Sequence, residues 1–446
     1  MASTYLTYTP SSAVTLGTKA TISFWVKRSK IDSGTDFYGI LSSNGGWNDG
    51  TGFAIGFRED MLVWYNLKDN SGYRTYPASL RKFRDCNSWY HILYQIDTTQ
   101  SAVQDRITLY VNGEDQGDMA TNTGSGISAA VPDQNNAPYQ FFDSGDQHQI
   151  GRGGSAGSTY FDGSLSHFNY VDGSVVAPTQ FGSTDATTGE WKINTSPSYT
   201  VGNNGFFVLK DGNSITDQSA NSNNFAVAGG TLTKTEDCPS NVFATFNPLD
   251  FHSRDLTMSN GNLTATNSGS ATWESKYAMS TLAMSAGKYY AEFKVGNVGT
   301  DQLYVAGIIA EPESQAINSS IGSFGIGLYS PGKIFNLTTE AQSGLGAIVA
   351  NDIIGVAFDV TNGTLQFYKN GSTIGSQITS IATSGKFWRF GCNGYDGSWV
   401  MNANFGNGYF GTTAISSEGT NASGIGKFEY DVPSGYTALS TKGLNE

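Results

Sequence analysis

Aromatic side chains lie in three segments that are otherwise rich in Gly, Asn, Asp and Ser, at residues 45–50, 70–76 and 393–399. This combination suits sugar binding, because an aromatic ring can stack on the apolar face of a sugar while amide, carboxylate and backbone groups orient its hydroxyls. The candidate ligand-binding residues are Trp47, Asn48, Asp49, Tyr73, Arg74, Tyr76, Tyr395 and Asp396. The alternative is that these aromatics cap the ends of a sheet sandwich or lie at a subunit contact. Both interpretations stay open for Trp47, whereas the alternative is favoured for Trp399, which begins a strand-like run.

The sequence holds no pattern that specifies a catalytic site. One G-x-S-x-G string occurs, at residues 153–157, but it lies in a glycine-rich run that opens no helix-like pattern, so it does not support a Ser-His-Asp site with any of the four histidines. His91 lies in a strand-like run, where a hydrogen-bonded structural histidine is expected. The glycine-rich segment 151–154 lacks a following Lys-Ser or Lys-Thr, which favours a turn over a phosphate loop. We therefore expect a protein that is not an enzyme, and we assign no catalytic residue.

The three cysteines, Cys86, Cys238 and Cys392, lie far apart in the chain. Their odd number argues against a disulfide framework, and no C-x-x-C pair or His cluster indicates zinc. Cys392 lies in a Phe-Gly-Cys-Asn-Gly run and is expected to be a small buried residue. The residues alone therefore assign no metal and no cofactor.

Composition limits the classes of partner. The chain has 25 Lys and Arg against 38 Asp and Glu, a net charge of −13. Because nucleic acids and anionic membranes are bound by clustered Lys and Arg, we expect neither as a partner. No run of 18 apolar residues predicts a membrane span, and residues 1–18 show no basic or apolar region of a signal peptide. The length favours two or three domains.

Short runs of β-branched and aromatic residues recur between Gly, Asn, Asp and Ser along the whole chain. Such runs predict strands, and no window has a sustained apolar period of 3.6 residues. The clearest expected strands are 21–27, 53–57, 61–65, 89–96, 107–111 and 365–369. The Glu59-Asp60 pair between two of them is expected to be a solvated hairpin tip. We predict an all-β chain of antiparallel β-sandwich, jelly-roll domains.

Two of these strands lead into the same dipeptide, Asn112-Gly113 and Asn370-Gly371. Asn-Gly favours a type I′ hairpin turn, because both central residues of that turn need a positive φ. The repetition suggests two domains of related architecture.

The segment 181–250 between the two halves is rich in Asn, Ser, Thr, Gly and Pro, but it holds strand-like pieces such as 205–210. An unstructured linker of that length would be unusual in a compact chain. We therefore predict domains at 1–180 and 251–446, with 181–250 as a connector packed on the first domain.

The first domain resembles the laminin-G-like, concanavalin A-like lectin fold. The pieces that carry the resemblance are 20–27, 88–92, 109–113, 149–152 and 160–165. Related folds include glycoside hydrolases, whose paired carboxylates often lie as E-x-D-x-x-E on one strand, and no such string occurs here. Laminin-G-like domains sometimes hold calcium near a rim. Asp32, Asp36, Asn48 and Asp49 would be the candidate ligands here, although solvated loop residues are the simpler interpretation.

The last 200 residues resemble a SPRY domain. The matching pieces are 287–293, 324–328, 351–359, 367–371 and 404–406. The resemblance implies a second sandwich of two sheets in tandem with the first.

Together, the laminin-G-like unit, a connector ending at 241–250 and the SPRY unit resemble large phage virion proteins. The resemblance implies a non-enzymatic tail fibre, spike or capsid fibre on the virion surface, made in the host cytoplasm. It also implies host-surface glycan and other virion proteins as partners, and a homo-oligomer such as a trimer. Two alternatives stay open: a decoration or connector protein that binds only other virion proteins, and a polysaccharide depolymerase.

Overall fold

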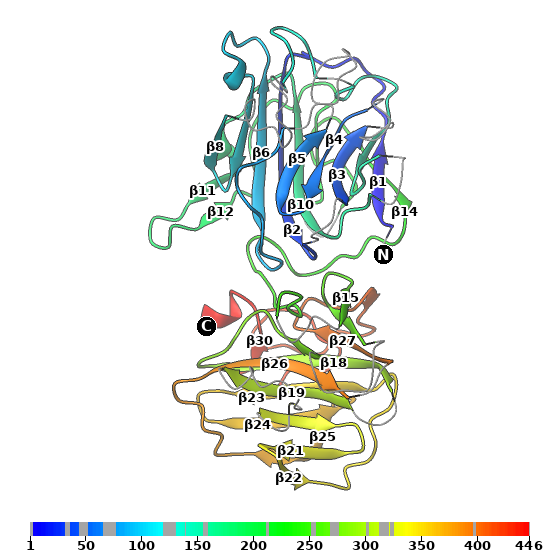
Figure 1. Cartoon of the computed structure of the whole chain (residues 1–446), viewed down its shortest axis with the longest axis vertical. Coiled ribbons are helices and arrows are strands. Elements are labelled where there is room, and N and C mark those ends of the chain that lie inside the picture. The colour runs from blue at the N-terminus through cyan, green and yellow to red at the C-terminus, as the bar shows by residue number, and fades with distance from the viewer. Residues whose placement is uncertain are drawn as a thin grey trace. The chain divides into compact units, whose positions relative to one another are not determined.

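The strand-like runs of the sequence form strands in the structure, a computed structural model (Figure 1). It describes residues 3–31, 36–43, 52–65, 77–118, 131–138, 140–154, 159–210, 214–250, 256–267, 276–299, 303–311, 321, 325–395 and 398–445. The chain divides into two units, Met1–Lys234 and Thr235–Glu446. Within the described ranges, no helix has the length and hydropathy needed to cross a membrane.

Two antiparallel six-stranded sheets form the first unit. The first sheet runs in the order β14 (Ala226–Gly229), β1 (Tyr5–Tyr8), β9 (His148–Ile150), β3 (Phe37–Ser43), β4 (Ala54–Arg58) and β5 (Met61–Tyr65). The second runs in the order β13 (Phe206–Val208), β10 (Gly163–Asp172), β2 (Lys19–Arg28), β6 (Tyr90–Asp97), β7 (Ile107–Val111) and β8 (Glu114–Asp118). A separate hairpin pairs β11 (Gly182–Thr184) with β12 (Trp191–Ile193).

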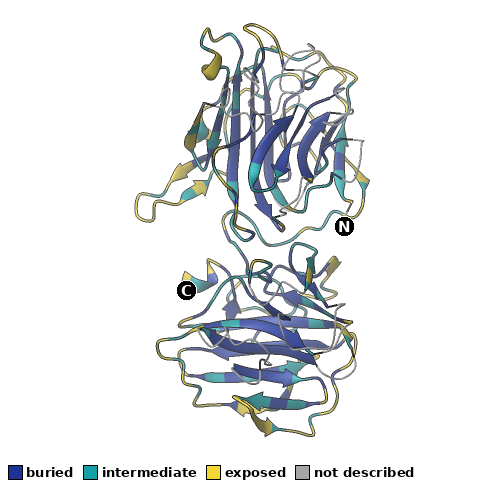
Figure 2. Cartoon of the chain, viewed as in Figure 1, coloured by how far each residue is buried: buried dark blue, intermediate teal, exposed yellow. Residues whose placement is uncertain are grey.

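The core of the first unit lies between these sheets, and its strands are mostly buried (Figure 2). Along β2, Ile22, Phe24 and Val26 join this core, while Ser23 and Trp25 lie on the opposite face of the sheet. This is the period of two that a strand imposes on its side chains. The alternation predicted at 21–27 is therefore what places the sandwich core.

Two main sheets also form the second unit. One runs in the order β15 (Thr257–Ser259), β16 (Thr264–Thr266), β27 (Trp399–Asn404), β18 (Lys288–Val298), β23 (Ile353–Asp359), β24 (Thr364–Lys369) and β25 (Ser372–Ile378), with β30 (Thr437–Ala438) parallel to β18. The other runs in the order β17 (Tyr277–Met279), β26 (Phe387–Gly394), β19 (Leu303–Glu311), β20 (Gly325–Tyr329), β21 (Lys333–Asn336) and β22 (Thr339–Gln342). A short hairpin pairs β28 (Tyr409–Phe410) with β29 (Thr413–Ala414).

The core of the second unit includes Trp399 and Cys392. Trp399 is fully buried in β27. Cys392 is buried as well, and burial raises the pKa of its thiol far above the usual value. All three cysteines are free thiols.

The division between the units differs from the predicted boundary at residue 250. Residues 206–208 and 226–229 add edge strands β13 and β14 to the two sheets of the first unit. The segment 235–250 belongs instead to the second unit, where Phe246 is buried and its ring packs edge-on against Phe405. The segment 181–250 is thus not one connector, because each part completes the unit next to it.

Both Asn-Gly turns have the geometry that the sequence predicts. The φ angles are +51° and +77° at Asn112 and Gly113, and +51° and +80° at Asn370 and Gly371. In each turn the Asn side-chain oxygen also accepts a backbone N–H from the neighbouring strand, at 2.8 and 2.9 Å. The turns therefore hold three strands together rather than two.

The Gly113 turn gives a testable prediction. At Gly113 a Cβ would lie 2.4 Å from the ring of Trp191, whereas at Gly117, with a nearly identical φ of +78°, a Cβ would meet nothing within 4 Å. Gly117→Ala should cost roughly 1–2 kcal/mol of unfolding free energy from backbone strain alone. Gly113→Ala should cost a further ~1–3 kcal/mol, because Trp191 must shift. Urea unfolding of both variants measures the difference, and equal losses would refute the contact.

Candidate binding site

Two of the predicted sugar-binding segments follow strands of one sheet, and the strand ends that flank them lie at the same end of that sheet. β3 ends at Ser43, β4 begins at Ala54 and β5 ends at Tyr65. The strand register pairs Ser42 with Ala54, and Ala54 with Tyr65. The strand ends that lead into 44–51 and 66–76 are therefore neighbours. The candidates on those segments lie outside the described residues: Trp47, Asn48, Asp49, Tyr73, Arg74 and Tyr76.

Backbone hydrogen bonds close the base of each segment. The Ser43 N–H donates to the Phe53 carbonyl at 3.1 Å, and the Phe53 N–H donates to Ser43 Oγ at 2.9 Å. On the neighbouring strand, the Trp64 N–H donates to the Pro77 carbonyl at 3.1 Å. Both segments therefore leave the sheet and return to it at fixed positions.

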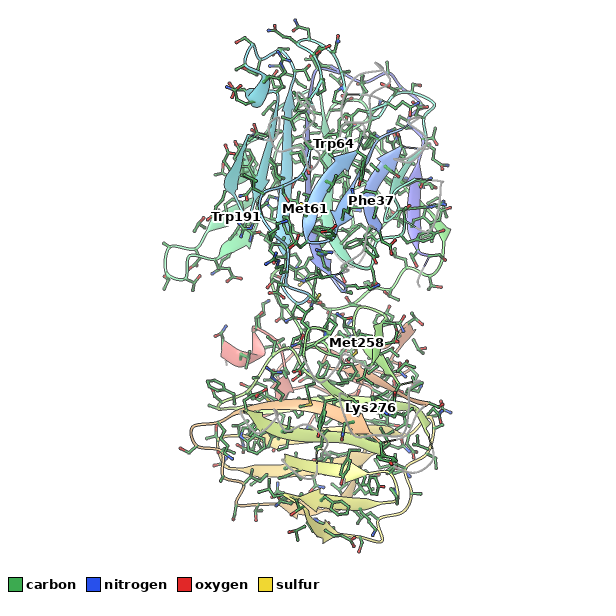
Figure 3. All side chains as sticks on the ribbon, viewed as in Figure 1. Phe37, Met61, Trp64, Trp191, Met258 and Lys276 are labelled. Atoms are coloured by element: carbon green, nitrogen blue, oxygen red, sulfur yellow. The ribbon has the colours of Figure 1, made fainter. Side chains whose placement is uncertain are left out.

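A buried aromatic cluster lies beneath these strand ends, and it comprises Phe53, Trp64, Phe141, Phe142 and His148. The ring of Phe53 lies 5.3 Å from Phe141 and 6.0 Å from Trp64, which is labelled in Figure 3. Phe142 stacks on His148 at 4.2 Å between ring centroids. Aromatic pairs at these separations add to the hydrophobic stabilisation of a core. The cluster thus packs beneath the strand ends, and we call these five residues the aromatic floor.

His148 links this cluster to the loop before β9. The Phe142 N–H donates to His148 Nε2 at 2.9 Å, so Nδ1 carries the proton and donates to the Asp146 carbonyl at 2.9 Å. Burial lowers the pKa of His148 to about 4, although its backbone hydrogen bonds oppose that shift. A neutral His148 is therefore part of the folded state at neutral pH.

His91 is also buried and also neutral, and its hydrogen bonds rule out a role as a base toward Ser23. Trp191 Nε1 donates to His91 Nδ1 at 3.1 Å, so the proton lies on Nε2, which contacts Ser23 Oγ at 2.9 Å. Nε2 must then donate to Ser23, whereas a catalytic histidine accepts the serine proton. Burial lowers the pKa of His91 to about 3. His91 is the structural strand histidine that the sequence predicts.

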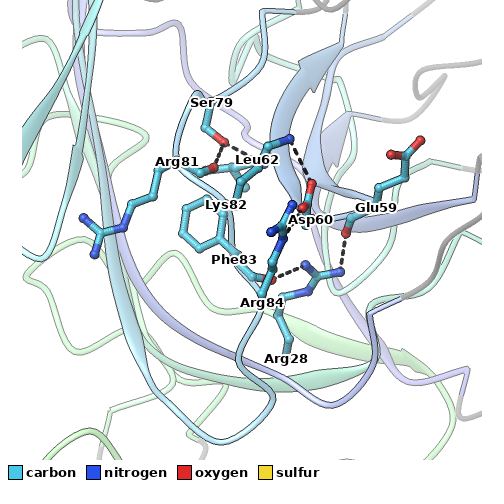
Figure 4. A network of polar contacts seen from close by, with 9 residues as sticks. All are labelled: Arg28, Glu59, Asp60, Leu62, Ser79, Arg81, Lys82, Phe83 and Arg84. Carbon is cyan, nitrogen blue, oxygen red and sulfur yellow. Dashed lines mark hydrogen bonds and ion pairs between the residues drawn. The ribbon is translucent and has the colours of Figure 1, made fainter. Parts of the chain in front are cut away.

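Arg28 of β2 contacts the other end of the β4–β5 hairpin, away from the candidate segments (Figure 4). Its side chain is almost fully buried. Its Nη1 donates to the Phe83 carbonyl at 2.8 Å and its Nη2 to the Glu59 carbonyl at 2.6 Å. The guanidinium also lies 4.3 Å from the ring centroid of Phe57. Because Arg28 ties two segments far apart in sequence, it fixes the end of the sheet away from the candidate segments.

Asp60 corrects the expectation that the Glu59-Asp60 tip is solvated. Its carboxylate pairs with Lys82 Nζ at 3.0 Å and with Arg84 Nε at 2.6 Å, and its side chain is 15% exposed (Figure 4). Burial alone would raise the pKa of Asp60, but the hydrogen bonds and charges of the two cations outweigh it and leave that pKa lowered. The hairpin tip is therefore held against a segment that follows it by 22 and 24 residues in the sequence.

The third predicted segment belongs to the second unit. Tyr395 is half-buried, and its carbonyl accepts a hydrogen bond from Lys276 Nζ at 3.2 Å. Asp396 lies outside the described residues. Tyr395 therefore lies in a different unit from the strands whose ends lead into 44–51 and 66–76.

The calcium candidates are largely untested by the geometry. Asp36 is exposed, while Asp32, Asn48 and Asp49 lie outside the described residues. Across the part of the chain that the structure describes, no group of three or more His, Cys, Asp or Glu could hold a metal ion.

Residues 2–179 match the concanavalin A-like lectin/glucanase superfamily, in its laminin-G-like branch, and residues 288–404 match the SPRY domain. The chain carries a concanavalin A-like domain and a SPRY domain. No curated protein matches the chain.

Several solved structures are similar to parts of the chain at low identity. The TRIM65 PSpry domain is 13% identical, with 36% of this chain and 88% of that chain covered and a TM-score of 0.29. A human SPRY domain is 15% identical, with 33% and 94% covered and a TM-score of 0.26. A heptameric SAP-like pentraxin from Limulus polyphemus is 16% identical, with 40% and 72% covered and a TM-score of 0.26. The domain assignment rests on the two family matches.

Acid should destabilise the aromatic floor of the candidate site by protonating His148. Because the pKa of His148 is about 4 in the folded chain and 6.5 is the ordinary value, its contribution to stability is complete above pH 6.5 and is lost as the pH falls toward 4. The full effect is about 3 kcal/mol. His148→Gln removes the titration but also the ring stacking, so the variant should be less stable at pH 7.5. The difference between wild type and variant should then shrink toward pH 4 in urea unfolding. A constant difference would contradict the assignment.

Proposed function

We propose that this chain is a non-enzymatic protein of a phage virion surface, as a tail fibre, spike or capsid fibre, that binds host-surface glycan or receptor. The observation that carries the binding proposal is that two polar, aromatic-containing segments leave neighbouring strand ends above one buried aromatic floor. Sites of this kind place adaptable contact residues on a rigid scaffold. The virion placement rests on the resemblance of the domain order to phage proteins, with other virion proteins as further partners and a homo-oligomer as the assembled form.

Two features support recognition over catalysis. His91 and His148 both use their ring nitrogens in fixed hydrogen bonds, so neither offers a free base to a substrate. The sequence also lacks the paired-carboxylate string of related glycosidases. Several weak sites on an oligomer would then supply avidity for a repetitive surface glycan.

The test is a bacterial glycan array probed with the full-length chain. Trp47→Ala and Tyr73→Ala should each weaken binding on the order of tenfold, since a stacking aromatic is a typical hot spot. Leu80→Ala, at a 69% exposed position outside the candidate segments, is the matched control and should bind as wild type.

The other outcomes separate the alternatives. No binding to any glycan would overturn the adhesion proposal and favour a decoration or connector protein. Release of reducing ends from a bound polysaccharide would favour a depolymerase.

A further inference from the structure

A cavity of about 380 Å³ lies in the second unit, where β18 begins and the C-terminal segment returns to pair with it. Its polar and aromatic lining residues are Lys288, Tyr289, Thr361, Ser423, Tyr436 and Thr437. Much of the wall, including Tyr436 and Thr437, comes from chain beyond residue 404, where the SPRY match ends. The cavity is of the size that small-molecule sites occupy.

The cavity is electrically neutral. Among the described residues, Lys288 is the one charged side chain that lines it, and Lys288 Nζ pairs with Asp359 Oδ2 at 3.2 Å. Asp359 is nearly buried and also accepts hydrogen bonds from Asn362. A cation already neutralised in this way gives little attraction to an anionic ligand, so the chemistry of the cavity favours a neutral one.

Its aromatic wall is held in place. Tyr436 is half-buried, hydrogen-bonds Thr364 and has Lys288 Nζ 5.9 Å from its ring centroid. Tyr289 is buried beside it in the lining. A sugar ring with one apolar face binds well to a fixed aromatic surface that has polar groups beside it.

Hydroxyl groups supply the polar contacts. Thr361 Oγ1 accepts the Gly287 N–H at 2.9 Å, which leaves its hydroxyl hydrogen to donate. Ser423 Oγ donates to Asn421 Oδ1 at 2.8 Å. Thr437 is 6% exposed, and its Oγ1 is buried with no hydrogen-bond partner among the described residues. That oxygen is closed to solvent, whereas Thr361 is exposed and its hydroxyl can donate to a ligand.

We propose that this cavity binds one neutral sugar unit of a glycan, stacked on Tyr436 and hydrogen-bonded to Thr361. The site goes beyond the proposed function, because it lies in the second unit and uses none of the segments assigned to binding in the first.

Saturation-transfer NMR on the full-length chain tests the proposal. The probes are glucose, galactose, mannose and N-acetylglucosamine, with acetate and inorganic phosphate as anionic arms. The Trp47→Ala, Tyr73→Ala background prevents sugar held by the first unit from contributing. At least one sugar should receive saturation and the anions should not. Saturation of no sugar, or of phosphate alone, would overturn the proposal.

Variants place the binding in the cavity. Ala422→Phe, at an exposed lining position, should fill the cavity and weaken sugar binding at least tenfold. Ala414→Phe, equally exposed but outside the lining, should bind as its parent. Thr361→Val removes the donating hydroxyl and keeps the shape, so sugar binding should weaken severalfold. Unchanged binding in Ala422→Phe would overturn the proposal.

The two proposals fail separately. Loss of glycan-array binding in the Trp47→Ala, Tyr73→Ala background with sugar saturation retained supports both sites. An array that stays empty while the cavity still takes up sugar leaves this inference standing without the adhesion function.

Discussion

The outer face of one sheet in each unit is covered by the chain that follows it, and this cover depends on one buried polar side chain. In the first unit that side chain is His91. Trp191 of the β11–β12 hairpin, labelled in Figure 3, stacks on His91 and donates a hydrogen bond to it. In the second unit it is Glu292. A buried polar group without its partners costs more than the hydrogen bond itself contributes, so each cover is required by the sheet beneath it.

Glu292 shows how completely such a group is satisfied. It is fully buried on the face of β18 away from the main core. Its carboxylate accepts the N–H groups of Glu429 and Tyr430 at 2.8 and 2.9 Å, and Asn404 and Tyr290 donate at 3.3 Å. Burial raises the pKa of Glu292 to about 7, against these hydrogen bonds, which lower it. The C-terminal segment that walls the cavity is thus bound to the sheet by a charge-sensitive contact.

Local patterns predicted the parts of the fold that depend on neighbours in sequence. The alternation at 107–111 and the Asn112-Gly113 turn both specify their own geometry, and the structure has them. The partner of His91 lies 100 residues away, and nothing in the pattern around Trp191 points to it. The cavity likewise joins Lys288 to Tyr436, which only the parallel pairing of β30 with β18 brings together. The aromatic segments of the candidate site were found by composition, and their strand ends by register.

Several ionisable groups of the described chain are bound up in contacts that hold the fold together. His91, His148, Arg28 and Glu292 are all buried, and each has fixed partners that hold a segment onto a sheet. A group in that position cannot change its proton or its partner during a reaction without loosening the segment it holds.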